Sequence, residues 1–286
     1  MFVPRKILEE KLAKLLAEDV GQGDVTSAAI LPVETTAEAQ VIAKAEGTLA
    51  GIEEAAVLAE SLGLQVEVNV DDGNQVQKGQ VLMSLWGDAA TILSVERTLL
   101  NLLSRMSGIA TATHNLTQKI EKANLKTRIT ATRKSAPGLL YFDKKAVIVG
   151  GGEPHRLHLD DMLLIKDNHL ALAGGLQEAL KLAKQYASFS KKIEVEVTNA
   201  VDAVKAAELG ADIVMLDNFT PAQIVEAVAQ FKKAGYFGRV LLEASGRISA
   251  ENLLDYAQTG VNLISLGELT HSVKALDISL EVVSLS

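Results

Sequence analysis

The chain has 286 residues, of which 48% are hydrophobic and 22% are charged, a composition typical of a globular protein with ample apolar material for a core. The formal net charge of −8 disfavours nucleic acid or an anionic membrane as the main partner. There is no Cys, which excludes disulfides, cysteine nucleophiles and thiolate metal sites. No apolar run approaches the roughly 20 residues of a membrane span and no secretion signal is visible, so a cytoplasmic location is expected.

The N-terminal third combines helical patterns with short β-like segments. Ile7–Ala17 has apolar residues at helical spacing, and Asp19–Ser27 (DVGQGDVTS) is interpreted as a structural turn. The alternative, a phosphate loop, is weak because this stretch lacks the lysine and the strand-then-helix setting of a P-loop. A β-like pattern begins at Thr36, a helix is predicted over Ile52–Ser61, and Gln65–Val70 alternates as a strand does.

Two turn-rich stretches next to that strand, Asp71–Asn74 and Gln77–Gly79, predict small twisted hairpins. Such hairpins resemble the half-barrel sandwich of lipoyl and biotinyl carrier domains. Those carriers present a lysine at a hairpin tip, and no lysine here has that setting. A carrier function is therefore disfavoured.

Thr91–Met106 predicts a helix whose apolar residues cover much of its circumference. A helix of this kind must be buried, within the chain or against another subunit. Arg97 and Arg105 lie eight residues apart, about two turns, and so on roughly one face. A second helix is predicted over Ala110–Lys122.

After residue 124 the sequence repeats the order strand, loop, helix. Short, β-rich and mostly apolar segments are typical of buried parallel strands, and here they are Leu125–Thr130, Val147–Val149, Met162–Ile165, Lys192–Val197, Ile213–Leu216, Val240–Leu242 and Leu263–Leu266. The helical patterns between them are Leu176–Ala187, Ala200–Leu209, Pro221–Ala234 and Ala250–Thr259. This alternation predicts an α/β domain whose parallel strands form a barrel or an incomplete barrel.

Cations and glycines are concentrated between Thr132 and His169, near the ends of predicted strands. The cationic candidates are Arg133, Lys134, His155, Arg156 and Lys166. A guanidinium grips a carboxylate or phosphate by two parallel hydrogen bonds, and the glycines Gly150–Gly152 let backbone N–H groups approach an anion. Each residue alone is more simply a solvated cation, but their recurrence at strand ends favours an anion site.

Carboxylates and further glycines follow the later strands. Glu196 and Asp217 can hold Mg²⁺, or the hydroxyls of a Mg²⁺-bound sugar, because Mg²⁺ prefers a few carboxylates with substrate oxygens completing its shell. Gly246 and Gly267 follow the last two strands, the usual place of a barrel phosphate cradle. Any one of these residues is more simply a helix cap or a turn, but the set at converging strand ends favours an active site.

Several motifs in register resemble the quinolinate phosphoribosyltransferase family, also called nicotinate-nucleotide pyrophosphorylases (carboxylating). They are TRKSAPG (Thr132–Gly138), GGGEPHR (Gly150–Arg156), LIKDNH (Leu164–His169), EVEVTN (Glu194–Asn199), MLDNF (Met215–Phe219), LLEASG (Leu241–Gly246) and ELTHS (Glu268–Ser272). The resemblance extends to GQGDVTS near the N-terminus, to ERTLLNLLSRMSGIATAT (Glu96–Thr113) and to ALDISL near the C-terminus, so it covers nearly the whole chain in order.

The resemblance implies an enzyme that joins quinolinate to phosphoribosyl pyrophosphate, with Mg²⁺, giving nicotinate mononucleotide, CO₂ and pyrophosphate in NAD biosynthesis. It implies an N-terminal α/β sandwich domain over residues 1–110, completed by about residues 273–286, and an open (incomplete) α/β barrel over residues 111–272. It also implies a homodimer, or a hexamer built from dimers, in which the neighbouring subunit completes each active site. Neither nucleic acid nor a membrane is an expected partner.

Position by position, the resemblance assigns a dicarboxylate pocket and a sugar-phosphate site. The residues matching the quinolinate pocket are Arg133, His155, Arg156, Lys166 and, from the partner subunit, Arg97; Thr132 is a further expected substrate-binding residue. Those matching the phosphoribosyl pyrophosphate site are Lys134, Glu196, Asp217 and the turns Ser245–Arg247 and Leu266–Glu268. The expected catalytic residues are Lys134, Lys166, Glu196 and Asp217, and Mg²⁺ is expected to be held mainly through substrate, with Glu196 and Asp217 as candidate ligands.

Three positions depart from the family pattern: Ala131 precedes TRK where an Asp is common, Arg247 follows Ser-Gly where Gly or Asn is frequent, and Glu268 replaces a usual Ala. Two relatives with the same fold are alternatives. The intact LIKDNH and the paired HR disfavour a molybdenum-associated paralogue, and the number of cations disfavours a phosphoribosyltransferase for the monoacid nicotinate. A non-catalytic binding or carrier protein is the alternative from another class.

Overall fold

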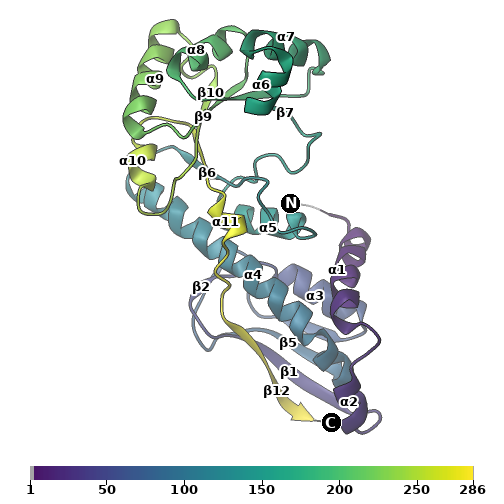
Figure 1. Cartoon of the computed structure of the whole chain (residues 1–286). Coiled ribbons are helices and arrows are strands. Elements are labelled where there is room, and N and C mark those ends of the chain that lie inside the picture. Colours follow the sequence, from purple (N-terminus) through teal and green to yellow (C-terminus); the bar gives the residue numbers. More distant parts are fainter. Residues whose placement is uncertain (1–2, 286) are drawn as a thin grey trace. The chain divides into compact units, whose positions relative to one another are not determined.

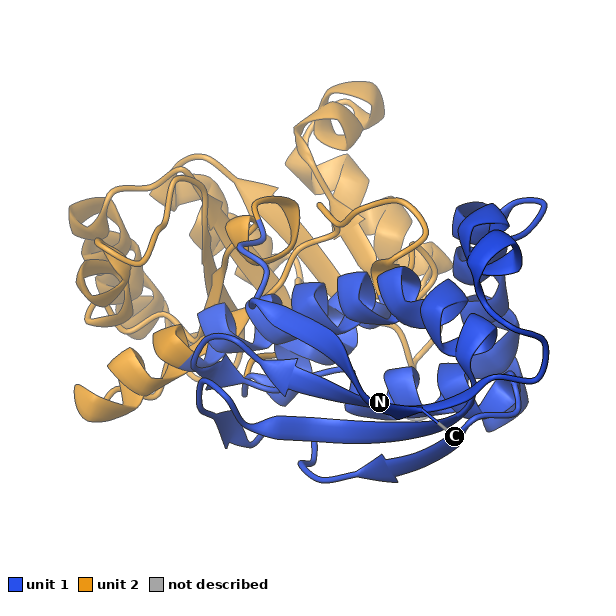
Figure 2. Cartoon of the chain, turned by 90° about the horizontal axis from the view of Figure 1, so that it is seen from below, with its two compact units in different colours: residues 1–114, 141–151, 273–286 blue, residues 115–140, 152–272 orange. Residues whose placement is uncertain are grey.

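The computed structural model describes residues 3–285, which cluster into two compact units (Figure 2). Unit 1 contains the chain up to His114, the segment Tyr141–Gly151, and the chain from Val273 onwards. Unit 2 contains Asn115–Leu140 and Gly152–Ser272. Residues 1, 2 and 286 of the expected N-terminal domain lie outside the described residues.

Unit 1 contains a four-stranded antiparallel sheet in the order β12-β1-β5-β3 (Figure 1). Its strands are β1 (Thr36–Ala43), β3 (Gln65–Val68), β5 (Val81–Asp88) and β12 (Ile278–Leu285). β1 alternates buried and more exposed residues, as a strand with one face on the core does. β12 pairs with β1 from Ala43–Ile278 to Ala37–Leu285, so the predicted return of the last strand into the N-terminal domain is confirmed.

The helices of unit 1 lie on one side of its strands (Figure 2). Besides α4 and α5, described below, they are α1 (Arg5–Val20), α2 (Val25–Ile30) and α3 (Ile52–Ser61), and a two-stranded ladder pairs β2 (Gly47–Thr48) with β4 (Gln75–Val76). The Asp24 carboxylate caps α2 by accepting hydrogen bonds from the backbone N–H groups of Thr26 and Ser27. The turn predicted over Asp19–Ser27 is therefore confirmed only for its middle part, residues 21–24, because α1 ends at Val20 and α2 begins at Val25.

Helix α4 (Ala89–Lys122) is continuous where two helices were predicted, so the separation between Met106 and Ala110 was wrong. Gly108 lies inside it because the chain leading to β12 passes very close: a Cβ at Gly108 would lie 2.2 Å from the carbonyl oxygen of Lys274. The glycine marks a close approach of two backbones and not a helix end. Within the described part of the chain no helix, α4 included, is long and apolar enough to cross a membrane.

The segment predicted as the strand Val147–Val149 is the last turn of helix α5 (Leu140–Val149), so that prediction was wrong. Six consecutive residues of α5, Phe142 to Val147, are buried, so burial does not single out one face of this helix. A run of three apolar residues cannot by itself distinguish a buried strand from a turn of a buried helix.

Lys145 ties α5 into unit 1 through a buried ion-pair cluster. Its ammonium donates hydrogen bonds to both carboxylate oxygens of Glu54, at 2.7 and 2.9 Å, and also contacts Glu53 and Asp72. Glu54 is fully buried, and burial raises the pKa of its carboxyl. The cluster is stable because cation and carboxylates compensate one another out of water.

Unit 2 is built on a six-stranded parallel sheet in the order β6-β11-β10-β9-β8-β7. The strands are β6 (Arg128–Thr130), β7 (Leu163–Ile165), β8 (Ile193–Val197), β9 (Ile213–Asp217), β10 (Leu241–Ser245) and β11 (Leu263–Ser265), and each overlaps a predicted strand. β6 and β7 are the two edges and do not pair with each other. The barrel is therefore open, as predicted.

Helices follow most of these strands and cover one face of the sheet. They are α6 (Asp167–Ala173), α7 (Leu176–Tyr186), α8 (Ala200–Glu208), α9 (Pro221–Ala234), α10 (Leu253–Ala257) and the short α11 (Glu268–His271). Strand residues Val195, Val214 and Leu242 pack with helix residues such as Leu180 and Phe231 in the hydrophobic core of unit 2. Because side chains alternate along a strand, the residues between them, including Glu194 and Glu243, face the interior of the open barrel.

We expect Lys145→Met to lower the free energy of unfolding by about 3–5 kcal/mol at neutral pH, because it leaves Glu54 buried without its cation. Urea unfolding measures this change. Lys192→Met is the control, since Lys192 and Asp212 form an exposed pair with a 3.6 Å N–O distance, and we expect a loss below about 1 kcal/mol. Equal stability of Lys145→Met and the unsubstituted chain would contradict the role of the buried cluster.

Candidate active site

A cavity of about 810 Å³ lies at the carboxyl ends of the unit 2 strands. Its polar lining comes from residues in or directly after β6 to β11 and from the segment before β7. These residues are Thr132, Arg133, Lys134, His155, Arg156, Lys166, Glu196, Asp217, Asn218, Glu243, Ser245, Gly246, Arg247, Ser265, Gly267, Glu268 and His271. The convergence of parallel strand ends explains why positions so far apart in the sequence line one cavity.

All but two of the expected site residues line this cavity. Leu266 does not, because it is 1% exposed and its backbone N–H donates to the carbonyl of Thr130. Arg97 belongs to unit 1, where its side chain is 63% exposed and lies 3.6 Å from Glu96. A largely exposed arginine is available to another molecule.

Arg133 and Arg156 bring two guanidinium groups to the cavity. Burial and then the charge of Arg133 lower the pKa of Arg156, although a guanidinium stays protonated at neutral pH. The Arg156 guanidinium donates a long hydrogen bond, 3.5 Å, to the carbonyl of Met162. The described residues place no carboxylate in an ion pair with either arginine, so an anion entering the cavity relieves their repulsion.

Lys166 and Glu196 form an ion pair at the ends of the neighbouring strands β7 and β8, with 2.7 Å between Nζ and Oε2. On the next strand, Asp217 accepts a hydrogen bond of 2.6 Å from the side-chain amide of Asn218. Both carboxylates therefore line the cavity with one oxygen already engaged. Each keeps further oxygen lone pairs for a ligand.

The turn after β10 is held by a close approach to the turn after β9. Gly246 has φ +97°, and a Cβ there would lie 2.4 Å from Oδ1 of Asn218. Arg247 follows in the left-handed region with φ 53°. After β11, a Cβ on Gly267 would lie 3.2 Å from Cδ of Lys134, so the lysine chain passes over this glycine. Both glycines leave room for backbone and ligand atoms to come close.

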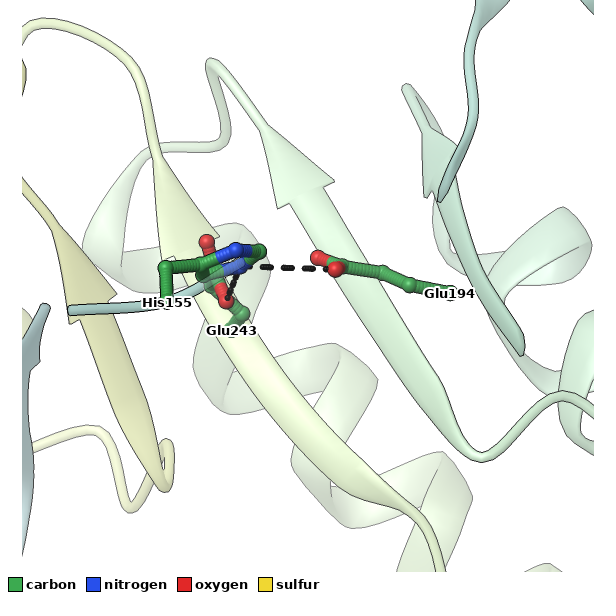
Figure 3. Close-up of side chains that lie close together, drawn as sticks. All are labelled: His155, Glu194 and Glu243. Atoms are coloured by element: carbon green, nitrogen blue, oxygen red, sulfur yellow. Dashed lines mark hydrogen bonds and ion pairs between the residues drawn. The ribbon is translucent and has the colours of Figure 1, made fainter. Parts of the chain in front are cut away.

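His155 lies between two fully buried carboxylates, Glu194 on β8 and Glu243 on β10 (Figure 3). Its Nε2 is 3.1 Å from Oε2 of Glu243 and 3.4 Å from Oε2 of Glu194. Its Nδ1 accepts a hydrogen bond of 2.9 Å from the backbone N–H of Arg156. Nδ1 therefore carries no proton, and the ring proton lies on Nε2, facing the carboxylates.

These three groups hold a proton tightly. Burial alone would lower the pKa of His155, but the interactions with Glu194 and Glu243 outweigh burial and raise the pKa to about 10. Burial also raises the pKa of Glu194. The three groups therefore retain a proton among them at neutral pH, which spares a second uncompensated charge in the interior.

The residues present fit Mg²⁺ near Glu196 and Asp217 but not at the histidine. Mg²⁺ takes one or two carboxylates and completes its shell with substrate oxygens, which suits two carboxylates beside an open cavity. A metal-binding histidine donates the N–H of its other nitrogen, whereas Nδ1 of His155 accepts a hydrogen bond. Geometrically, His155, Glu194 and Glu243 could enclose an ion, but the tautomer opposes it.

Glu194 and Glu243 lie within the motifs EVEVTN and LLEASG but were not included among the expected site residues. A signal was present: IEVEV in β8 and LLEAS in β10 each place a carboxylate within an otherwise apolar strand. A buried carboxylate is costly without a partner, so such a strand predicts a compensating group nearby. The sequence does not identify His155 as that group, because the contact joins three separate segments.

The chain matches both domains of one known family. Residues 24–107 match the N-terminal domain of quinolinate phosphoribosyl transferase, and residues 109–281 match its C-terminal domain. Together these ranges cover most of the chain.

Individual relatives agree with this match. The chain is 43% identical over 271 residues to a probable nicotinate-nucleotide pyrophosphorylase [carboxylating] of Methanothermobacter thermautotrophicus, covering 95% of this chain and 97% of that protein. It is 42% identical over 280 residues to the Bacillus subtilis protein of the same name, covering 96% and 93%. The solved nicotinate-nucleotide pyrophosphorylase of Francisella tularensis superposes with a TM-score of 0.90 at 38% identity over 99% and 98% of the two chains. The chain therefore belongs to the quinolinate phosphoribosyltransferase family, as its motifs predicted.

Proposed function

We propose that the chain transfers the phosphoribosyl group of phosphoribosyl pyrophosphate to quinolinate, releasing pyrophosphate and CO₂ and forming nicotinate mononucleotide in NAD biosynthesis. The observation that carries this proposal is the pair of guanidinium groups, Arg133 and Arg156, which line one cavity while no carboxylate of the described residues forms an ion pair with either. Two unneutralised cations side by side suit a dianion with two adjacent carboxylates.

The cavity offers a second, chemically different half for the sugar phosphate. Glu196 and Asp217 can accept hydrogen bonds from ribose hydroxyls, and the turns at Gly246 and Gly267 allow backbone N–H groups to approach phosphate oxygens. Lys134 and Arg247 add positive charge next to these turns. The strand order supports this division of the cavity into two halves. Glu196, Asp217 and the two glycine turns follow the four central strands, whereas the cations of the dicarboxylate half lie near the edge strands β6 and β7.

Bound Mg²⁺ would neutralise charge that develops on the departing pyrophosphate, with Glu196 and Asp217 as the protein groups that would hold it together with substrate oxygens. The chain itself supplies orientation. Arg133 and Arg156 fix the dicarboxylate so that the pyridine nitrogen faces the ribose carbon, and the carboxylates tolerate positive charge on the sugar ring. We assign no protein nucleophile.

Decarboxylation follows from the bond that the transfer makes. Once the ring nitrogen bears the ribose, its positive charge stabilises the electron pair left on the neighbouring ring carbon when CO₂ departs. That carbon then takes a proton to complete nicotinate mononucleotide. We assign Lys166, whose ammonium is 2.7 Å from Glu196, to the part of the cavity that faces the ring carbon from which CO₂ departs.

The purified protein should release CO₂ and pyrophosphate from quinolinate and phosphoribosyl pyrophosphate in the presence of Mg²⁺, and should not use nicotinate at a comparable rate. A monoacid leaves one guanidinium unpaired in a buried site, which weakens binding. Labelled CO₂ release and product chromatography measure the two activities. Preferential use of nicotinate, or turnover without pyrophosphate release, would refute the proposed function.

Arg133→Ala should lower kcat/KM for quinolinate by about 10-fold or more, since it removes a charge-assisted hydrogen-bond partner of the dianion, worth about 1.5–3 kcal/mol. Steady-state kinetics at saturating phosphoribosyl pyrophosphate give the value. Arg128→Ala is the matched control: Arg128 lies on β6, its side chain is 49% exposed and it pairs with Glu153. If the two variants behaved alike, the assignment of the dicarboxylate half would be wrong.

We further propose that the enzyme is a homodimer, alone or within a hexamer, and that Arg97 of each subunit completes the site of the other. Arg97 does not line the cavity of its own chain, and its side chain is largely exposed. A symmetric dimer would bring the same arginine to both cavities.

Co-expression of Arg97→Ala and Lys166→Ala chains with different tags tests the shared site. Each variant alone should be nearly inactive. The purified heterodimer should regain about half of the unsubstituted activity, because one of its two sites has both residues intact. A heterodimer as inactive as its parents would show that Arg97 acts within its own chain, and analytical ultracentrifugation checks the dimer itself.

A further inference from the structure

The structure assigns Glu243, supported by Glu194, as the positioning residue of the dicarboxylate pocket: it holds the His155 ring, and the ring holds the main chain of Arg156. This inference rests on the proposed function for the identity of the anion. The resemblance assigned no role to Glu243 or Glu194.

The first step is the backbone of His155. Its φ is 55°, in the left-handed region, which is unfavourable for a residue other than glycine and persists when the surroundings impose it. The ring imposes it from both nitrogens: Nδ1 accepts from the backbone N–H of Arg156 at 2.9 Å, and Nε2–H donates to Glu243 at 3.1 Å.

The second step is what this leaves for substrate. With both nitrogens engaged inside the protein, the His155 ring has no polar atom to offer to a quinolinate carboxylate. Its contribution to the pocket is therefore indirect. It fixes the residue that follows, Arg156, whose guanidinium lines the cavity while only 9% of the residue is exposed.

The third step distinguishes two effects that Glu243 could have on quinolinate binding: positioning of His155, and repulsion of the ligand by its charge. Glu243 is fully buried, lines the cavity and carries a charge of the same sign as the ligand. If its charge were its only influence, its removal would tighten dianion binding, because like charges repel. If it positions His155, loss of the acceptor weakens binding. The two readings predict opposite signs.

The test is a pair of substitutions of similar shape. Glu243→Gln keeps an acceptor oxygen for Nε2–H, and Glu243→Leu removes it. Calorimetric titration with quinolinate should give a dissociation constant within about threefold of the unsubstituted enzyme for Glu243→Gln, and one raised about 5- to 100-fold for Glu243→Leu, the cost of an unsatisfied buried donor. The KM for phosphoribosyl pyrophosphate should stay within about twofold in both.

Leu242→Met controls for repacking, since Leu242 precedes Glu243 on β10, is buried in the hydrophobic core of unit 2 and is not among the residues that line the cavity. This variant should bind quinolinate as the unsubstituted enzyme does. Should Glu243→Leu fail to fold, His155→Phe, which keeps a ring and removes both nitrogens, must show the same selective loss of quinolinate binding.

Unchanged or tighter quinolinate binding in Glu243→Leu would overturn the inference, as would an equal loss for both substrates or a loss confined to phosphoribosyl pyrophosphate. These results differ from a failure of the proposed function, in which the unsubstituted enzyme would itself neither bind nor convert quinolinate.

Discussion

Unit 2 depends on the alternation of side chains along its parallel strands. On β8 the sequence IEVEV sends Ile193, Val195 and Val197 to the helices and Glu194 and Glu196 to the interior. The apolar face supplies the hydrophobic core, and the polar face lines the open barrel. A shift of one residue would bury the carboxylates against helices, so the pattern that stabilises the fold also determines the site.

The polar interior contains several charged side chains, which are compensated differently in the depth of the cavity and near its opening. The deeper carboxylates, Glu194 and Glu243, are compensated by the His155 ring and by a retained proton. Nearer the opening, Glu196 pairs with Lys166. Arg133 and Arg156 are left without an ion pair among the described residues, which leaves the excess positive charge where a dianionic substrate would bind. The negative charge of the deeper carboxylates is compensated, and the positive charge nearer the opening is not. This distribution favours an anion in the cavity although the chain as a whole is negative.

Sequence patterns predicted the strands and helices of unit 2 well where the patterns were long or repeated, and failed where they were short. Helix α9 (Pro221–Ala234) has the predicted bounds, aided by Pro221 and by the Thr220 cap. The three-residue run Val147–Val149 was misread, because a short apolar run fits a buried strand and a buried helix equally well. The break near Gly108 was misread because this glycine is explained by the close approach of a second segment, at Lys274. The family resemblance, carried by several motifs in register, identified most of the residues that line the cavity.

The sequence by itself determined the alternation of strands and helices, the cations, carboxylates and glycines at the strand ends, and the family. These features depend on neighbouring residues. Residues in one helix or strand share a backbone geometry, which gives the sequence a regular spacing of apolar and polar residues. Only the tertiary structure decided that His155 points inward to Glu243 and Glu194, and that segment 141–151 joins unit 1 through Lys145. Such contacts join residues tens of positions apart, and their energy comes from compensating buried charge, which no local pattern encodes.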